Sequence, residues 1–201
     1  MKLLFVVALA LLLSSVALAT PDSSQLGQYT VSFDLNTDMQ YQKSVVEPTE
    51  AGVQTLSQLR IFTDNSTAAS ISVVEYKDLT DATISMHKSL MTFQMILSGF
   101  NVTSVEDMTI DGKPGFVEES VPVSSALGMP ADAKLYSAMY WIDSAACGDC
   151  GAVSAGKTYV AVSSSYPQDV TQSLLSSLHV EMGQATAAAA TTTQDMPPAQ
   201  N

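Results

Sequence analysis

The chain has 201 residues and a net charge of −12. This charge argues against some classes of function but does not indicate a particular one. Without the N-terminal segment discussed next, 7 basic side chains oppose 20 acidic ones, a net charge of −13. Because such a surface repels phosphate backbones and anionic lipid head groups, we expect no nucleic-acid partner.

Residues 1–19 have the pattern of a secretory signal peptide. Lys2 gives a positive start, Leu3–Leu13 is apolar, and Ala17-Leu18-Ala19 is a typical cleavage site. The alternative is an N-terminal membrane anchor, but the apolar run is too short to span a bilayer comfortably. We therefore expect cleavage after Ala19 and a secreted or extracytoplasmic protein without an integral membrane span.

The remaining chain suits one domain. Residues 20–27 are polar and are predicted to be a flexible N-terminal segment. Residues 28–182 are predicted to form a single α+β domain, long enough to build a hydrophobic core. Residues 183–201 are dominated by Ala, Thr, Gln and Pro without periodicity, which predicts a disordered tail.

The first half of the domain reads as strands. Tyr29–Leu35 alternates apolar and polar residues, which is typical of a half-buried strand. Gln42–Val46, Thr55–Thr63 and Ser70–Tyr76 favour further strands through their β-branched and aromatic residues.

The spacing of apolar residues changes to three or four positions over Asp78–Ser98, which is predicted to be an amphipathic helix of about five turns. Its apolar positions are Ala82, Met86, Leu90, Phe93 and Leu97. We expect Met86 and its neighbouring methionines to fill the core. Gly99 lies where a left-handed residue ends a helix.

A hairpin follows this helix. Two strand-like runs, Phe100–Ile110 and Phe116–Val123, flank the sequence Asp-Gly-Lys-Pro-Gly, which predicts a tight turn. We expect Gly112 and Gly115 to supply positive φ angles in it.

The last third predicts a second hairpin and a helix. Lys134–Asp143 is apolar on both faces, which is typical of a central strand covered on both sides. Thr158–Ser164 is its expected partner, and Pro167 suits the first turn of a closing helix. The order of elements therefore predicts an α+β fold, an α/β/α sandwich with a central antiparallel sheet and helices on both faces.

Four features resemble the PsbP-like superfamily, which includes the extrinsic photosystem II subunit and many exported proteins, mostly of unknown function. They are a Y-x-V-x-F strand at Tyr29–Phe33, an I-D-G-x-x-G turn at Ile110–Gly115 after the long helix, an aromatic strand at Tyr136–Trp141 paired with Tyr159–Ser163, and a Ser-Ser-Tyr-Pro sequence before the closing helix that ends at Ser177–Val180. Together they cover Gln28 to Glu181. The resemblance implies the same α/β/α sandwich and no particular activity. A simple secretory signal and a C-x-x-C loop depart from the photosynthetic members.

Cys147 and Cys150 form the C-x-x-C motif. In an oxidising compartment we expect a disulfide bond between them. A redox-active dithiol is an alternative, although no helical pattern follows the motif. A metal site is a third possibility, but the only histidines, His87 and His179, lie on separate predicted helices.

Carboxylates crowd both arms of the first hairpin. Clustered oxygen ligands suit calcium, so Asp107, Asp111, Glu118 and Glu119 are candidate metal ligands. The loop pattern of a calcium site is missing, and a solvated acidic strand face explains the same residues. We therefore predict no metal and no cofactor.

Asn65 and Asn101 lie in glycosylation sequons, and Asn65, in a predicted turn, suits modification better. The chain contains no G-x-S-x-G, Walker or dinucleotide-binding pattern. The sequence therefore predicts an exported accessory or binding module that is not an enzyme, with an unidentified protein or small-molecule partner. The alternative is a redox or metal-handling protein that uses Cys147 and Cys150.

Overall fold

The computed structural model describes residues 21–63, 67–77, 84–124, 129–130, 132–143, 145–146, 153–154 and 156–183. No helix in these ranges is long and apolar enough to cross a membrane. The predicted signal peptide, the sequon at Asn65, both cysteines and the tail from residue 184 onward lie outside the described residues.

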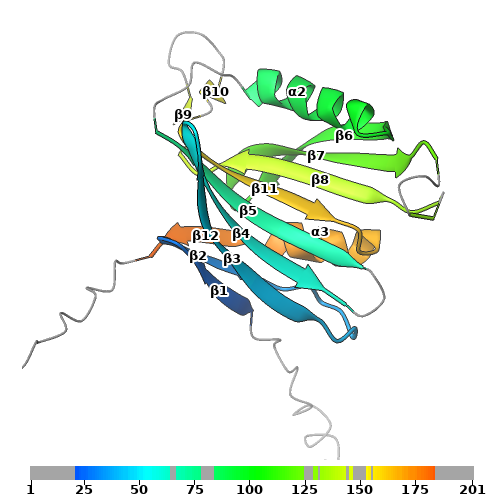
Figure 1. Cartoon of the computed structure of the whole chain (residues 1–201), viewed down its shortest axis with the longest axis horizontal. Coiled ribbons are helices and arrows are strands. Elements are labelled where there is room, and N and C mark those ends of the chain that lie inside the picture. Colours follow the sequence, from blue (N-terminus) through cyan, green and yellow to red (C-terminus); the bar gives the residue numbers. More distant parts are fainter. Residues whose placement is uncertain are drawn as a thin grey trace, which may run out of the picture.

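Seven strands form one antiparallel sheet in the order β3-β4-β5-β11-β8-β7-β6 (Figure 1). They are β3 (Gln42–Ala51), β4 (Gln54–Phe62), β5 (Ala68–Tyr76), β6 (Phe100–Ile110), β7 (Lys113–Pro122), β8 (Leu135–Trp141) and β11 (Thr158–Ser164). Strand β8 lies inside the sheet, with Tyr140 buried on one face and Trp141 on the other, as its doubly apolar sequence predicts. A separate two-stranded pair joins β9 (Ala145–Ala146) to β10 (Val153–Ser154).

The turn between β6 and β7 contains only two residues, because Ile110 pairs directly with Lys113. Asp111 and Gly112 have φ angles of 53° and 68°, the signature of a type I′ hairpin. The expectation of a positive φ at Gly115 is wrong. Gly115 lies within β7, where a Cβ atom would come within 2.5 Å of the Met139 carbonyl oxygen, so this position requires glycine for lack of space.

A second antiparallel sheet has the order β1-β2-β12 and consists of β1 (Asp22–Leu26), β2 (Tyr29–Phe33) and β12 (His179–Met182). The prediction of a flexible segment over residues 20–27 is therefore wrong for Asp22–Leu26. This strand has little apolar alternation, and its pairing with β2 determines its conformation. Gly27, with a φ of 59°, makes the turn between the two strands.

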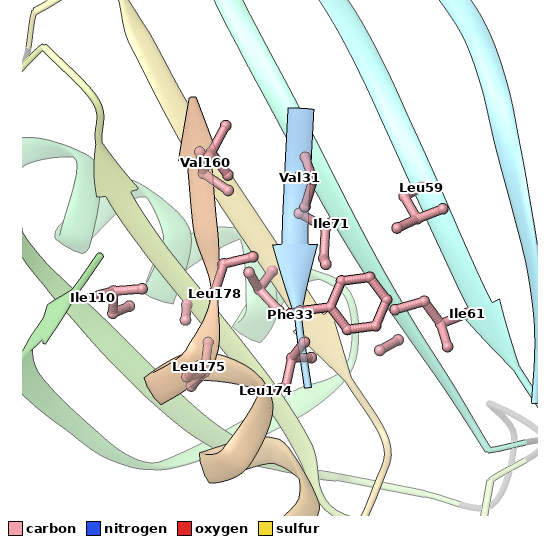
Figure 2. Packing of buried hydrophobic residues seen from close by; sticks show 14 of the residues in the cluster. Val31, Phe33, Leu59, Ile61, Ile71, Ile110, Val160, Leu174, Leu175 and Leu178 are labelled. Carbon is pink, nitrogen blue, oxygen red and sulfur yellow. The ribbon is translucent and has the colours of Figure 1, made fainter. Parts of the chain in front are cut away.

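The main core lies between one face of the large sheet and a cover formed by the small sheet and α3 (Gln168–Ser177). Figure 2 shows that side chains from both sheets and from this helix gather in one cluster, which includes Val31, Phe33, Leu59, Ile61, Ile71, Val160 and Leu174. Each of these side chains is 0% exposed.

The opposite face of the large sheet carries α2 (Ile84–Leu97), which lies over β6 and β7 (Figure 1). The predicted α/β/α sandwich is therefore wrong. The described chain is mostly β-sheet, with two main antiparallel sheets, one short two-stranded pair and two helices. The physical reason is that both ends of the domain form strands, and the small sheet occupies much of the face where the sequence predicted a helical layer.

Candidate functional site

Few apolar side chains attach α2 to the large sheet. Ile84 and Met91 pack against a small cluster whose buried members are Phe116 and Trp141. The ring of His87 meets Trp141 edge to face, with 5.1 Å between the ring centroids. None of the residues of α2 is buried, although all of them lie in the described part of the chain.

Polar contacts complete this attachment. The Lys88 ammonium lies 2.7 Å from an Asp107 carboxylate oxygen and 6.0 Å from the centre of the Phe116 ring. The Thr92 hydroxyl donates a 2.7 Å hydrogen bond to Oε2 of Glu118. The inner face of α2 therefore holds both of the helix's titratable side chains, His87 and Lys88.

Glu118 is the most enclosed acidic group beneath α2. Its side chain is 0% exposed, and its Oε1 atom has no hydrogen-bond partner among the described residues. Burial raises the pKa of Glu118, and the hydrogen bond from Thr92 opposes this shift. The surface of the large sheet beneath α2 thus contains a carboxyl group that is easier to bury in its protonated form.

The outer face of α2 is apolar and exposed. Its side chains keep large exposed fractions: Met86 48%, Leu90 50%, Phe93 57%, Ile96 55% and Leu97 70%. Surface apolar residues are ordinary when scattered, but a contiguous patch of them marks an interaction site. These five residues, called the outer face of α2 from here on, are the candidate functional site.

The sequence-based expectation that Met86 fills the core is wrong, and most of the predicted apolar stripe points outward with it. The helix carries apolar residues on two sides, and the side with Ile84 and Met91 contacts the aromatic cluster of the sheet. Periodicity detects an apolar stripe but does not say which stripe meets the rest of the fold.

The four carboxylates proposed as metal ligands do not converge. Asp107 pairs with Lys88, whereas Glu119 projects from the other face of the sheet and pairs with Lys134 at 2.8 Å. Glu118 lies beneath α2, and Asp111 lies in the hairpin turn. Within the described ranges, no group of three or more His, Cys, Asp or Glu side chains could hold a metal ion.

Asp111 instead connects the two sheets. Its carboxylate accepts hydrogen bonds from the Val180 amide at 3.0 Å and the Tyr140 hydroxyl at 3.3 Å, and it lies 2.6 Å from Nδ1 of His179. The hydrogen bond with Asp111 raises the pKa of His179. The sequence placed this histidine at the end of the closing helix, whereas in the structure it is the first residue of β12.

The remaining predicted modification site that is described, Asn101, is exposed near the start of β6, the strand at one edge of the large sheet. The predicted disulfide between Cys147 and Cys150 and the sequon at Asn65 fall on residues that are not described, so both stay predictions.

Comparisons of the chain with protein-family profiles, with curated proteins and with solved structures find no match. The resemblance to the PsbP-like superfamily therefore remains a prediction.

Proposed function

We propose that the protein is an exported, non-catalytic accessory module, and that the outer face of α2 is its docking surface for a second copy of the same chain. The observation that carries this proposal is the exposure of five large apolar side chains on one side of one helix. The signal-peptide pattern of residues 1–19 supports export.

The exposed apolar area of the patch is large enough for a weakly associating dimer. If each of the five side chains offers roughly 100 Å² of accessible area, the outer face supplies about 500 Å², more than half of the roughly 800 Å² per partner in a standard interface. Phe93 and Leu97, four positions apart, form one row along the helix, as do Met86 and Leu90. Such rows are the ridges that interdigitate when two helices pack across a two-fold axis.

Charge opposes association of two copies least at the outer face of α2. Two chains of net charge −13 repel one another over most of their surfaces. The described helix carries no charged side chain on its outer face, since His87 contacts Trp141 and Lys88 pairs with Asp107 on the inner face. Two copies can therefore approach through α2 with less repulsion than through an acidic surface.

Sedimentation equilibrium of the chain processed after Ala19 tests this, over protein concentrations from about 1 μM to about 1 mM. We expect a monomer–dimer equilibrium in this range. Leu90→Glu and Phe93→Glu should each weaken dimerisation by about 30-fold or more, because each buries a charge at the centre of the interface.

The matched control is Met182→Glu, which also adds a charge at an apolar residue with 68% exposure, but on β12 of the small sheet. It should leave the dimer unchanged. A protein that stays monomeric at every concentration, or a dimer that tolerates both α2 substitutions, would show that the outer face of α2 does not bind a second copy.

A further inference from the structure

Glu118 is a buried acid between β7 and α2. Its side chain is 0% exposed, and its Oε1 atom has no hydrogen-bond partner among the described residues. The side chain recorded in contact with its other carboxyl oxygen is that of Thr92, and Lys88, one turn earlier on α2, is paired with Asp107 instead. A buried carboxylate with neither a cation nor several donors is costly, so this position favours the protonated acid.

The Thr92 hydroxyl gives a geometric reason for the same protonation state. Its oxygen lies 2.7 Å from Oε2 of Glu118 and 3.1 Å from the backbone carbonyl oxygen of Lys88, and both are hydrogen-bonding distances. A threonine hydroxyl carries one proton, so it can donate to only one of these oxygens. When Glu118 is ionised, the Thr92 proton goes to Oε2 and the contact with the carbonyl oxygen has none. When Glu118 is protonated, it donates to Thr92, Thr92 donates to the carbonyl oxygen, and each contact has its own proton.

The element that can move to relieve an ionised Glu118 is α2. Strand β7 is held by backbone pairing with β6 on one side and with β8 on the other. By contrast, none of the described residues of α2 is buried. An element with so few buried contacts opens at a lower free energy than the sheet beneath it. Outward movement of α2 would let water hydrate the Glu118 carboxylate.

We propose that α2 is a pH-operated cover on the large sheet, docked over β6 and β7 when Glu118 is protonated and opening away from them when Glu118 is ionised. Burial raises the pKa of Glu118, so the docked form holds the Glu118 proton more tightly than the open form does. Docking is therefore strongest below the ordinary glutamate pKa of 4.5 and weakens as the pH rises through the higher value of the docked form. The inference concerns the inner face of α2 and does not depend on the proposed dimer.

The elements packed against Glu118 carry few other titratable groups on this face of the sheet. The residues that pair with Glu118 do not titrate, and they are Val105 of β6 and Ser137 of β8. The charged or titratable side chains on the packed elements are His87 and Lys88 of α2 and Asp107 of β6. A substitution at Glu118 alone separates its contribution from theirs.

Hydrogen–deuterium exchange followed by mass spectrometry tests the proposal on the chain processed after Ala19, at a protein concentration below the range in which the proposed dimer is expected to form. The measured quantity is the protection factor, the exchange rate of an unstructured chain divided by that of the folded protein, which removes the intrinsic effect of pH on exchange. We expect the protection factors of α2 to be lower at pH 8 than at pH 4.5 by roughly fivefold or more. At both pH values β5 and β11 should stay protected over times at which α2 exchanges, because α2 opens while the sheet remains folded.

Glu118→Gln holds this position in a form that does not ionise. Its amide group can donate to Thr92, as the protonated acid does. In this variant α2 should keep at pH 8, within about twofold, the protection factors that it has at pH 4.5.

The matched control is Glu119→Gln, the same substitution at the next residue of β7. Glu119 lies on the opposite face of the sheet, where it pairs with Lys134 at 2.8 Å. This control should show the same loss of α2 protection between pH 4.5 and pH 8 as the wild type.

Four results would overturn the proposal. The protection factors of α2 in the wild type could be the same at both pH values, or α2 could exchange no faster than β5 and β11. Glu118→Gln could lose α2 protection as the wild type does, or Glu119→Gln could abolish the pH response as Glu118→Gln is expected to do.

Discussion

The two faces of the large sheet are built differently. On one face, side chains of the small sheet and α3 interdigitate with those of β4, β5, β8 and β11, and many of them are completely buried. On the other face, α2 covers a cluster with two buried aromatic residues, Phe116 and Trp141, and none of the helix's own described residues is buried.

This difference predicts which face of the sheet contributes most to the stability of the fold. Burial of apolar area drives folding, so the packed face should supply most of the free energy of unfolding. The α2 face buries less and keeps the larger part of its apolar stripe in contact with solvent. An element with few buried contacts is also the kind that opens locally at low cost.

The largest expected effect is the loss of a side chain from the packed face. Phe33→Ala should lower the free energy of unfolding by roughly 3–5 kcal/mol, because it leaves a cavity in a core where Phe33 is 0% exposed. Urea denaturation followed by circular dichroism measures this change.

Phe93→Ala is the matched substitution on α2, and its effect should stay within about 0.5 kcal/mol, since this side chain is 57% exposed. It should be measured at a protein concentration below the range in which the proposed dimer is expected to form. Similar losses for the two variants would mean that α2 contributes as much to stability as the packed face, and the contrast between the faces would fail.

Effects smaller than that of Phe33→Ala are expected at two glycines of the β6–β7 hairpin, one tightly packed and one open to solvent. Gly115→Ala should cost roughly 1–3 kcal/mol, because its Cβ would lie 2.5 Å from the Met139 carbonyl oxygen and 2.8 Å from Cβ of Tyr140. Gly112→Ala should cost about 1 kcal/mol, since this residue has a positive φ but nothing within 4 Å of the added atom. The comparison of the two denaturation curves separates lack of space from backbone strain, and an equal cost would argue against the close approach of β7 to β8.

The sequence was sufficient where local pattern determines structure. The alternation of Tyr29–Leu35 predicted β2, the doubly apolar Lys134–Asp143 run predicted an inner strand, and Asp111-Gly112 predicted the hairpin turn. Strand β1 was missed because three of its five residues are Ser or Gln. Strand β12 was read as the end of a helix because His179–Met182 is only four residues long and is specified by pairing with β2.

The candidate sites could be predicted less well, because they depend on tertiary contacts. Both sides of the α2 sequence contain apolar residues, and only the position of Phe116 and Trp141 decides which side is covered. The acidic hairpin was noticed, but alternation along β7 sends Glu118 beneath α2 and Glu119 to the opposite face. A strand's register with its neighbours, and the elements packed on each face, cannot be read from the spacing of carboxylates alone.

A pH dependence of stability is also expected from the α2 face. The folded protein holds the Glu118 proton more tightly than the unfolded chain does, because burial raises the pKa of Glu118. Its contribution to stability is therefore greatest below the ordinary glutamate pKa of 4.5 and decreases as the pH rises through the higher folded value. The side chain recorded in contact with the Glu118 carboxyl group is that of Thr92, and Lys88, one turn earlier on α2, is already paired with Asp107.

Glu118→Gln isolates this contribution. At pH 8 the free energy of unfolding of the variant should exceed that of the wild type by on the order of 1 kcal/mol. This difference between the two proteins should decrease as the pH falls toward 4.5. Urea denaturation at several pH values gives the difference between the two proteins, in which the titration of the other carboxylates largely cancels. Glu50→Gln, which alters an exposed carboxylate on β3, should give a difference that does not change with pH in this way. A wild type more stable than Glu118→Gln at pH 8 would mean that the ionised carboxylate has a partner beneath α2. The attachment of α2 to the large sheet would then be stronger than its few contacts indicate.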